Sequence, residues 1–122
     1  SNTTTLLLER NETNRVELAL IRWPEGSRGA MAAHKDKEQT FFVLEGKGTV
    51  TISGETRDIA PGHVVFVPRN APHTSEAVEG KLVYLCLNSL VNAADESFDT
   101  MYKRVIPGRM ERWQKGDDSV GE

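Results

Sequence analysis

The stretch QTFFVLEGKGTVTIS (residues 39–53) decides the fold class of this 122-residue chain. Its first half contains the aromatic and β-branched run FFV (41–43), which suits a pleated sheet. Its second half alternates Val and Ile with Thr and Ser, which is the period of a half-buried strand. The segment GKG (46–48) between them predicts a turn, so the stretch predicts one strand on each side of it.

Short strand patterns continue on both sides of this stretch, separated by Gly, Pro or charged turns. The hairpin after Ser53 is expected to turn at Gly54-Glu55, with Gly in the first turn position. Seven or eight short strands in about 75 residues predict an all-β sandwich or barrel over about residues 15–90. The other predicted strands are RVELALIRW (15–23), GAMAAH (29–34), TRDIA (56–60), HVVFV (63–67), one beginning near His73, and KLVYLCLNS (81–89).

The pattern changes near the C-terminus. DESFDTMYKRV (95–105) places Phe98, Met101, Tyr102 and Val105 on one apolar stripe at helical spacing. We therefore expect a helical extension over about residues 94–115, covering the barrel or contacting a second copy.

Length and composition exclude several classes of protein. The chain has the size of one domain, so we treat residues 1–122 as a single domain. Lys and Arg total 15 against 18 Asp and Glu, which argues against a nucleic-acid partner. The apolar run Leu6-Leu7-Leu8 is too short for a signal-peptide core or a membrane span. A lone cysteine, Cys86, favours a reducing compartment, so we expect a cytoplasmic protein without a membrane partner.

Candidate site residues follow from strand parity. If residues 29–34 and 39–45 form a hairpin, His34 lies opposite Gln39, and Ala32 faces Phe41 on the same side. A bulge would instead turn the neighbouring Glu38 inward.

Parity also divides the last predicted strand into two faces. One carries Tyr84, Cys86 and Asn88, and the other carries Val83, Leu85 and Leu87. The aliphatic face is the better candidate for the packed side, so the face with Tyr84 lies either at the pocket or on the outer sheet. Cys86 is expected to be a buried, inert thiol, and His63 a turn residue.

Two segments give the chain a resemblance to the cupin superfamily, the small single-domain, RmlC-like jelly rolls. The positions of the first cupin motif are occupied by Gly26, Ala32, His34, Gln39 and Gly46, and those of the second by Gly62, Pro68, Asn70, His73 and Ala77. Asn70 replaces a glycine, and Asn tolerates a left-handed backbone better than other side chains. The resemblance implies a double-stranded β-helix barrel with a pocket inside.

The resemblance also implies a divalent metal ion in that pocket. Cupins commonly hold Fe, Mn, Ni or Zn with three His and one Glu. Here the matching positions give His34, Gln39 and His73 as ligands, while Ala32 replaces the first His. Such an ion would be weakly bound or absent, because an anionic ligand and an imidazole are both missing. The small-molecule pocket is expected to be lined by Ala32, Phe41, Val43 and Tyr84.

Two functions remain open. One is a metal-dependent enzyme acting on a small polar or carboxylate-bearing molecule, with its reaction type and catalytic residues unassigned. The other is a non-catalytic small-molecule-binding or sensory cupin without a tightly bound metal. A metal-free epimerase has no motif-level support, since no His–carboxylate pair with an opposing Tyr is evident. Exposed sheet edges and the amphipathic extension predict a homodimer.

Overall fold

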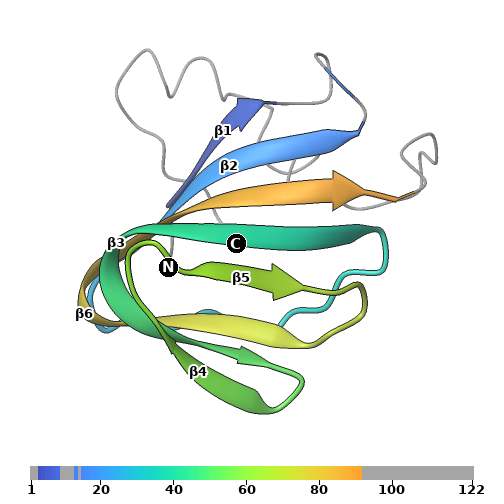
Figure 1. Cartoon of the computed structure of the whole chain (residues 1–122). Helices are drawn as coiled ribbons and strands as arrows, with labels where there is room; N and C mark the ends of the chain where they lie inside the picture. Colours follow the sequence, from blue (N-terminus) through green and yellow to red (C-terminus); the bar gives the residue numbers. More distant parts are fainter. Residues whose placement is uncertain (1–2, 9–12, 14, 92–122) are drawn as a thin grey trace.

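The structure is a computed structural model that describes residues 3–8, 13 and 15–91 (Figure 1). The regular structure in these residues is entirely β-strand, which confirms the all-β prediction. The expected helical extension lies outside them. Among the same residues no helix is long and apolar enough to cross a membrane. The strands are β1 (Thr3–Leu8), β2 (Val16–Trp23), β3 (Lys37–Ile52), β4 (Glu55–Ile59), β5 (Val64–Val67) and β6 (His73–Leu90).

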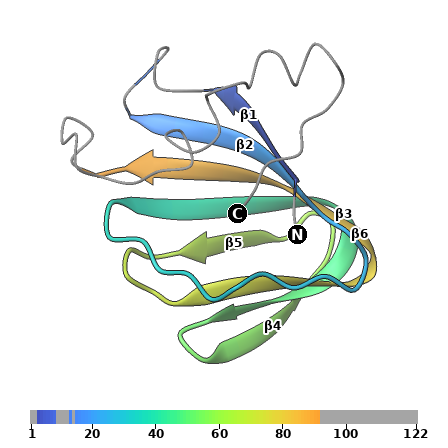
Figure 2. The same cartoon turned by 180° about the vertical axis from the view of Figure 1, so that it is seen from behind.

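Two long strands, β3 and β6, organise the fold. They pair antiparallel from Lys37 opposite Leu90 to Ile52 opposite His73. β2 pairs with β6, and β1, which the sequence analysis does not predict, pairs with β2. β4 and β5 both pair with β3. Both long strands fold back at one side of the molecule, at the left of Figure 1 and the right of Figure 2, so their halves lie in two facing layers.

The bend in β3 depends on two glycines. The pairing register with β6 shifts repeatedly between Val43 and Gly48, which marks β-bulges. A Cβ on Gly46 would lie 2.1 Å from the Lys81 carbonyl oxygen, and one on Gly48 would lie 2.1 Å from that of Glu76. The predicted turn at residues 46–48 is therefore wrong. It is a bend inside one continuous strand, and because β6 is continuous too, the described residues form fewer strands than expected.

The β3–β4 hairpin turns one residue earlier than predicted. Ile52 pairs with Glu55, so the turn residues are Ser53 and Gly54. Both have positive φ angles, 49° and 84°. This combination belongs to the type I′ turn, whose twist matches that of the flanking strands.

The hairpin expected between residues 29–34 and 39–45 is wrong. Ala32 of the earlier segment instead forms an isolated bridge with His73 of β6, and the preceding Arg28 forms one with Glu76. The first half of β3 is already paired with β5 on one side and β6 on the other, so no edge is available to this segment. His34 is therefore not paired with Gln39, nor Ala32 with Phe41.

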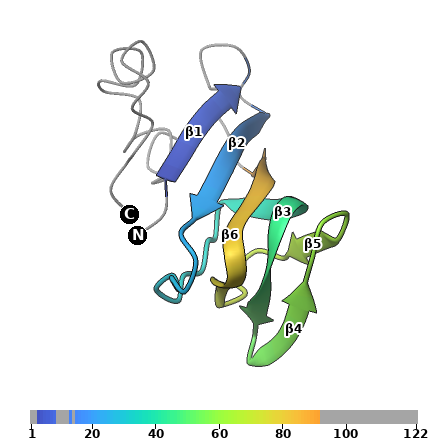
Figure 3. The ribbon, with the colours of Figure 1, turned by 90° about the vertical axis from the view of Figure 1, so that its left-hand side faces the viewer.

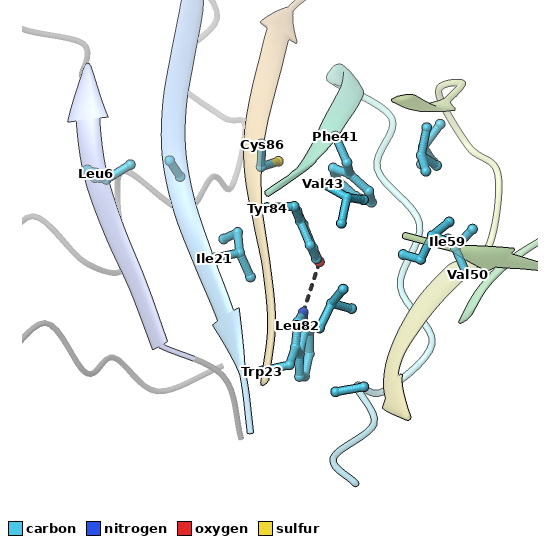
Figure 4. Close-up of a cluster of buried hydrophobic side chains, with 14 residues drawn as sticks. Leu6, Ile21, Trp23, Phe41, Val43, Val50, Ile59, Leu82, Tyr84 and Cys86 are labelled. Carbon is cyan, nitrogen blue, oxygen red and sulfur yellow. Dashed lines mark hydrogen bonds between the residues drawn. The ribbon is translucent and has the colours of Figure 1, made fainter. Parts of the chain in front are cut away.

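The two layers enclose one apolar core (Figure 4). Tyr84 and Cys86 of β6 lie in it, facing the inner residues Ile21 and Ala19 of β2. The expectation that the aliphatic face of this strand packs inward is wrong, since Leu85 and Leu87 are only half-buried on the opposite face. Figure 3 shows the edge of the layer to which β1, β2 and β6 belong.

Candidate functional site

Two histidines that are distant in sequence meet at the end of the barrel. The ring centroids of His34 and His73 lie 5.2 Å apart in an edge-on arrangement. Ala32 and His73 exchange two backbone hydrogen bonds, 2.9 and 2.8 Å long, and the Asn70 amide donates to the His34 carbonyl oxygen at 2.7 Å. Asn70 has a φ of 66°, which agrees with the left-handed backbone expected there. These contacts bring the two imidazoles together.

The backbone fixes the tautomer of His73. Its Nδ1 lies 3.0 Å from the carbonyl oxygen of Ala71, which can only accept, so Nδ1 carries the proton. Burial lowers the pKa of His73 below 6.5, the hydrogen bond to Ala71 opposes this effect, and the positive charge of Lys37 lowers the pKa further. At neutral pH the ring is therefore uncharged, and Nε2 presents a lone pair. A metal-binding His usually has its other ring nitrogen held in this way.

Gln39 enters the barrel from β3 and is nearly fully buried, while Glu38 is exposed, so the bulge that would turn Glu38 inward does not occur. The Gln39 Nε2 donates to Asn88 Oδ1 at 3.0 Å and contacts the Cys86 sulfur at 3.6 Å. Among the residues that the structure describes, Gln39 Oε1 has no hydrogen-bond partner. A buried carbonyl oxygen without a donor is costly, and a cation, a water or a ligand hydroxyl would satisfy it.

A buried polar layer supports Gln39, and sequence reasoning missed most of it. Asn88 Nδ2 lies 3.5 Å from Glu17 Oε1, and the Cys86 thiol donates to Asn88 Oδ1 at 3.3 Å. Glu17, Asn88 and Lys37 are all buried. Strand alternation could have predicted that Glu17 points inward, because it lies on the same face of β2 as three buried residues, Ala19, Ile21 and Trp23. Nothing in the local sequence indicates that Lys37 is buried.

The layer fixes the direction of the Gln39 amide. Because Asn88 Nδ2 points toward a carboxylate, its Oδ1 must accept from Gln39, and the Gln39 NH₂ group is then committed to Asn88. Gln39 Oε1 is thereby left as the atom that can serve a ligand. Asn88 and Glu17 are positioning residues for this oxygen.

The expected pocket residues divide into two groups. Phe41, Val43 and Tyr84 belong to the apolar core, where the Phe41 and Tyr84 ring centroids are 4.6 Å apart. The Tyr84 hydroxyl accepts a 2.9 Å hydrogen bond from Trp23 Nε1 and lies 3.3 Å from Ser75 Oγ. Burial raises the pKa of Tyr84 to about 12, so it keeps its proton. Ala32 is half-buried directly opposite His73.

The remaining reactive side chains do not contribute to the site. Burial raises the pKa of Cys86 to about 12, which fits the expectation of an inert thiol. His63 is exposed, and its Nδ1 accepts a hydrogen bond from the Ala60 amide across a turn, as expected for a turn residue.

The donor set fits a divalent ion only in part. Two imidazoles bound tetrahedrally to one ion have ring centroids roughly 5 Å apart, since metal–nitrogen bonds are about 2.0–2.1 Å. The 5.2 Å between the ring centroids of His34 and His73 agrees with this, whereas Gln39 stands as a third ligand only by its motif position. Within the described part of the chain, however, no three His, Cys, Asp or Glu side chains are grouped to hold a metal. A site here would have two imidazoles and a neutral amide.

Comparison with known families identifies the fold. Residues 19–88, more than half of the chain, match the family described as Cupin domain. An uncharacterized protein of Methanocaldococcus jannaschii is 29% identical over 55 residues, which are 45% of this chain and 44% of that protein. The chain therefore aligns with less than half of this relative.

Several solved structures share the architecture. KdgF from Halomonas sp. superposes with a TM-score of 0.67 and 21% identity, over 73% of this chain and 78% of that one. A predicted oxalate decarboxylase from Thermotoga maritima superposes with a TM-score of 0.70 and 22% identity, over 74% of this chain and 81% of that one. The DMSP lyase DddQ from Ruegeria pomeroyi superposes with a TM-score of 0.69 and 20% identity, over 80% of this chain and 49% of that one. At this level of identity the likeness shows the fold alone.

Proposed function

Since this chain belongs to the cupin family, we propose that it is a metal-dependent enzyme acting on a small polar or carboxylate-bearing molecule. His34, His73 and the carbonyl oxygen of Gln39 would hold the ion. The observation that carries the proposal is the convergence of the two imidazoles at a spacing that suits one shared ion.

A bound divalent ion would supply Lewis acidity, polarising a substrate oxygen or lowering the pKa of a water molecule. The chain's own residues have separate tasks. Ala71 holds the proton of His73 on Nδ1, and Asn88 keeps the Gln39 carbonyl oxygen available.

Charge favours an anionic substrate. Two neutral imidazoles and an amide would leave the charge of a divalent ion uncompensated by its own ligands. A substrate carboxylate bound to the ion would compensate it. The name of the Thermotoga neighbour, a predicted oxalate decarboxylase, agrees with this class of substrate.

A specific observation favours a second function, a non-catalytic small-molecule-binding or sensory cupin. The positive charge of Lys37 near His73 opposes a cation, and the family's anionic ligand is replaced by Gln39. In this case the same side chains would bind a ligand that carries a hydroxyl or amine donor, because Gln39 Oε1 and His73 Nε2 both accept. For either function, the single buried cysteine supports a reducing compartment such as the cytoplasm.

Metal analysis of protein purified without a metal-affinity resin separates the two functions. The enzyme proposal expects at least about half an equivalent of metal per chain, or calorimetric binding of added Mn²⁺, Fe²⁺, Ni²⁺ or Zn²⁺. His73→Ala and His34→Ala should abolish it, whereas His63→Ala, which changes the exposed turn histidine, should not. A folded protein that binds none of these ions would overturn the metal proposal and leave the binding function.

A further inference from the structure

We propose that Glu17, which lies outside both cupin motifs, decides whether the site takes a ligand that donates hydrogen bonds or one that accepts them. Two amides, Asn88 and Gln39, connect its carboxylate to the site, and these three side chains form a relay. The direction of the relay depends on the polar layer alone. Its consequence for metal binding rests on the proposed function.

The relay is one row across three neighbouring strands. Glu17 of β2 is opposite Asn88 of β6, and Asn88 is opposite Gln39 of β3. Side chains that are opposite one another in register point to the same side of a sheet. Here that side is the interior, since Glu17 and Asn88 are 0% exposed and Gln39 is 7% exposed. Bulk water therefore does not satisfy these groups, and their hydrogen bonds depend on one another.

Only Glu17 has a fixed hydrogen-bonding role in the relay. An ionised carboxylate can only accept, whereas each amide has a donor end and an acceptor end and can turn around. Asn88 therefore directs Nδ2 to Glu17 Oε1, 3.5 Å away, and its Oδ1 accepts from Gln39 Nε2 at 3.0 Å. The Cys86 thiol does not choose the direction. It donates to Asn88 Oδ1 at 3.3 Å, and its sulfur could accept from Nδ2 if that amide turned.

The site end of the relay exerts no opposing preference. Lys37 is the next buried residue on the inner face of β3, and its ammonium group can only donate. It does not hold the Gln39 oxygen in place, because Oε1 has no hydrogen-bond partner among the described residues. The direction is thus determined from the other end, by Glu17.

The direction of the relay determines which atom Gln39 presents to a ligand. With a carboxylate at position 17 this atom is Oε1, which suits a cation, a hydroxyl or an amine. A neutral amide at position 17 would allow both other amides to turn, and Gln39 Nε2 would then be presented. A nitrogen donor suits a carboxylate and excludes a metal ion. Glu17 is therefore a positioning residue that determines specificity through Gln39.

Nuclear Overhauser measurements on the metal-free full chain test the direction of the relay. Gln39 Nε2 lies 3.6 Å from the Cys86 sulfur, so its amide protons should give a strong signal to the Cys86 β-protons. Glu17→Gln should weaken this signal by at least about half, because a neutral amide at position 17 permits both directions. Glu38→Gln removes the same charge from the exposed residue before Gln39, and it should leave the signal unchanged.

The double variant Glu17→Gln/Asn88→Asp distinguishes a relay from a merely structural role. It moves the carboxylate to β6, where it can accept from the new amide on β2 and from Gln39 Nε2. The wild-type signal should therefore return, at unchanged total charge. A signal that ignores Glu17→Gln, or one that the double variant does not restore, would overturn the proposal. If Glu17→Gln alone does not fold, a folded double variant with the wild-type signal supports the relay, and an unfolded one overturns it.

Calorimetric titration with Mn²⁺ separates this inference from the proposed function. The affinity should fall at least about twofold in Glu17→Gln and recover in the double variant, because only molecules that present Gln39 Oε1 bind the ion fully. If the wild type binds no Mn²⁺ while the amide signal behaves as expected, the proposed function fails and the relay stands. If Mn²⁺ binds through His73 while the amide signal ignores Glu17, the relay is wrong and the proposed function stands.

Discussion

Replacing Gln39 by glutamate tests whether charge or placement limits metal binding. The change restores an anionic ligand at nearly the same position without altering either histidine. In the metal-free protein it replaces the Nε2 donor, 3.0 Å from Asn88 Oδ1, by a carboxylate oxygen. Two hydrogen-bond acceptors then face each other. A buried acceptor without its donor costs about 1–3 kcal/mol. Asn88 keeps the Cys86 thiol as a donor, but the new acceptor facing it is charged, so we expect a loss of about 2–3 kcal/mol in the free energy of unfolding.

The gain appears when metal is added. An anionic ligand in place of an amide should raise the affinity for Mn²⁺ or Zn²⁺ at least about 100-fold, which is about 2.7 kcal/mol. A metal present at 100 times its dissociation constant stabilises the folded state by about 2.7 kcal/mol. Added metal should therefore raise the free energy of unfolding of the Gln39→Glu variant by about as much as the substitution lowers it.

Urea unfolding with EDTA or with metal, together with calorimetric titration, measures both effects. Gln39→Leu is the matched control, because it also loses the hydrogen bond to Asn88 but gains no charge. It should be destabilised like the glutamate variant and should bind metal less tightly than the wild type. Equal metal affinity in the wild type, Gln39→Glu and Gln39→Leu, with binding still dependent on His73, would refute the assignment of Gln39 to the site.

Three further predictions concern stability. Tyr84→Phe should lower the free energy of unfolding by about 1–3 kcal/mol, measured in urea, because the buried Trp23 Nε1 loses its acceptor. Asn70→Ala should lower the free energy of unfolding by about 1–2 kcal/mol, because alanine tolerates the φ of 66° at this position less well. Asn70→Gly should change it by less than about 0.5 kcal/mol, and thermal unfolding measures both. Between about pH 9 and 12 the folded Cys86 thiol keeps a proton that the unfolded thiol releases, so this group should lower the free energy of unfolding by about 1.4 kcal/mol per pH unit, a contribution that urea unfolding should find missing in Cys86→Val.

Spacing and periodicity predicted the all-β fold. The distances between motif positions anticipated that His34 and His73 would share one region, although 39 positions separate them in the sequence. The left-handed backbone at Asn70 followed from residue chemistry alone. These inferences succeeded because each depends on a short-range steric rule or on a conserved register between distant strands.

Strand partners could not be predicted in the same way. Residues 29–34 are next to β3 in sequence, yet they bridge to β6, because β3 has both edges occupied. Their Ala-rich composition carries no information on a partner. The turn expected at Gly46 is a bulged bend within β3. Glycine is needed there because the Lys81 backbone lies too close for a Cβ atom, and not because the chain turns.

The error over the faces of β6 has an informative cause. Hydrophobicity was taken to mark the inner side, but Leu85 and Leu87 lie outside while Tyr84, Cys86 and Asn88 lie inside. The rule fails here because the inner side of β6 combines the aromatic core residue Tyr84 with the polar layer around Asn88, so hydrophobicity alone does not mark it.

The polar layer inside the barrel bears on how the proposed metal site could work with fewer ligands. Four clustered ligands that include a carboxylate would repel one another or stay unsatisfied without an ion, whereas Gln39 donates to Asn88, which also bonds Glu17 and the Cys86 thiol. The neutral set therefore costs the metal-free fold little beyond the Gln39 oxygen that has no partner among the described residues. The same neutrality would lower the affinity for a cation. On the proposed function, stability without metal and weak metal binding would then have one cause, and Gln39→Glu should change both together.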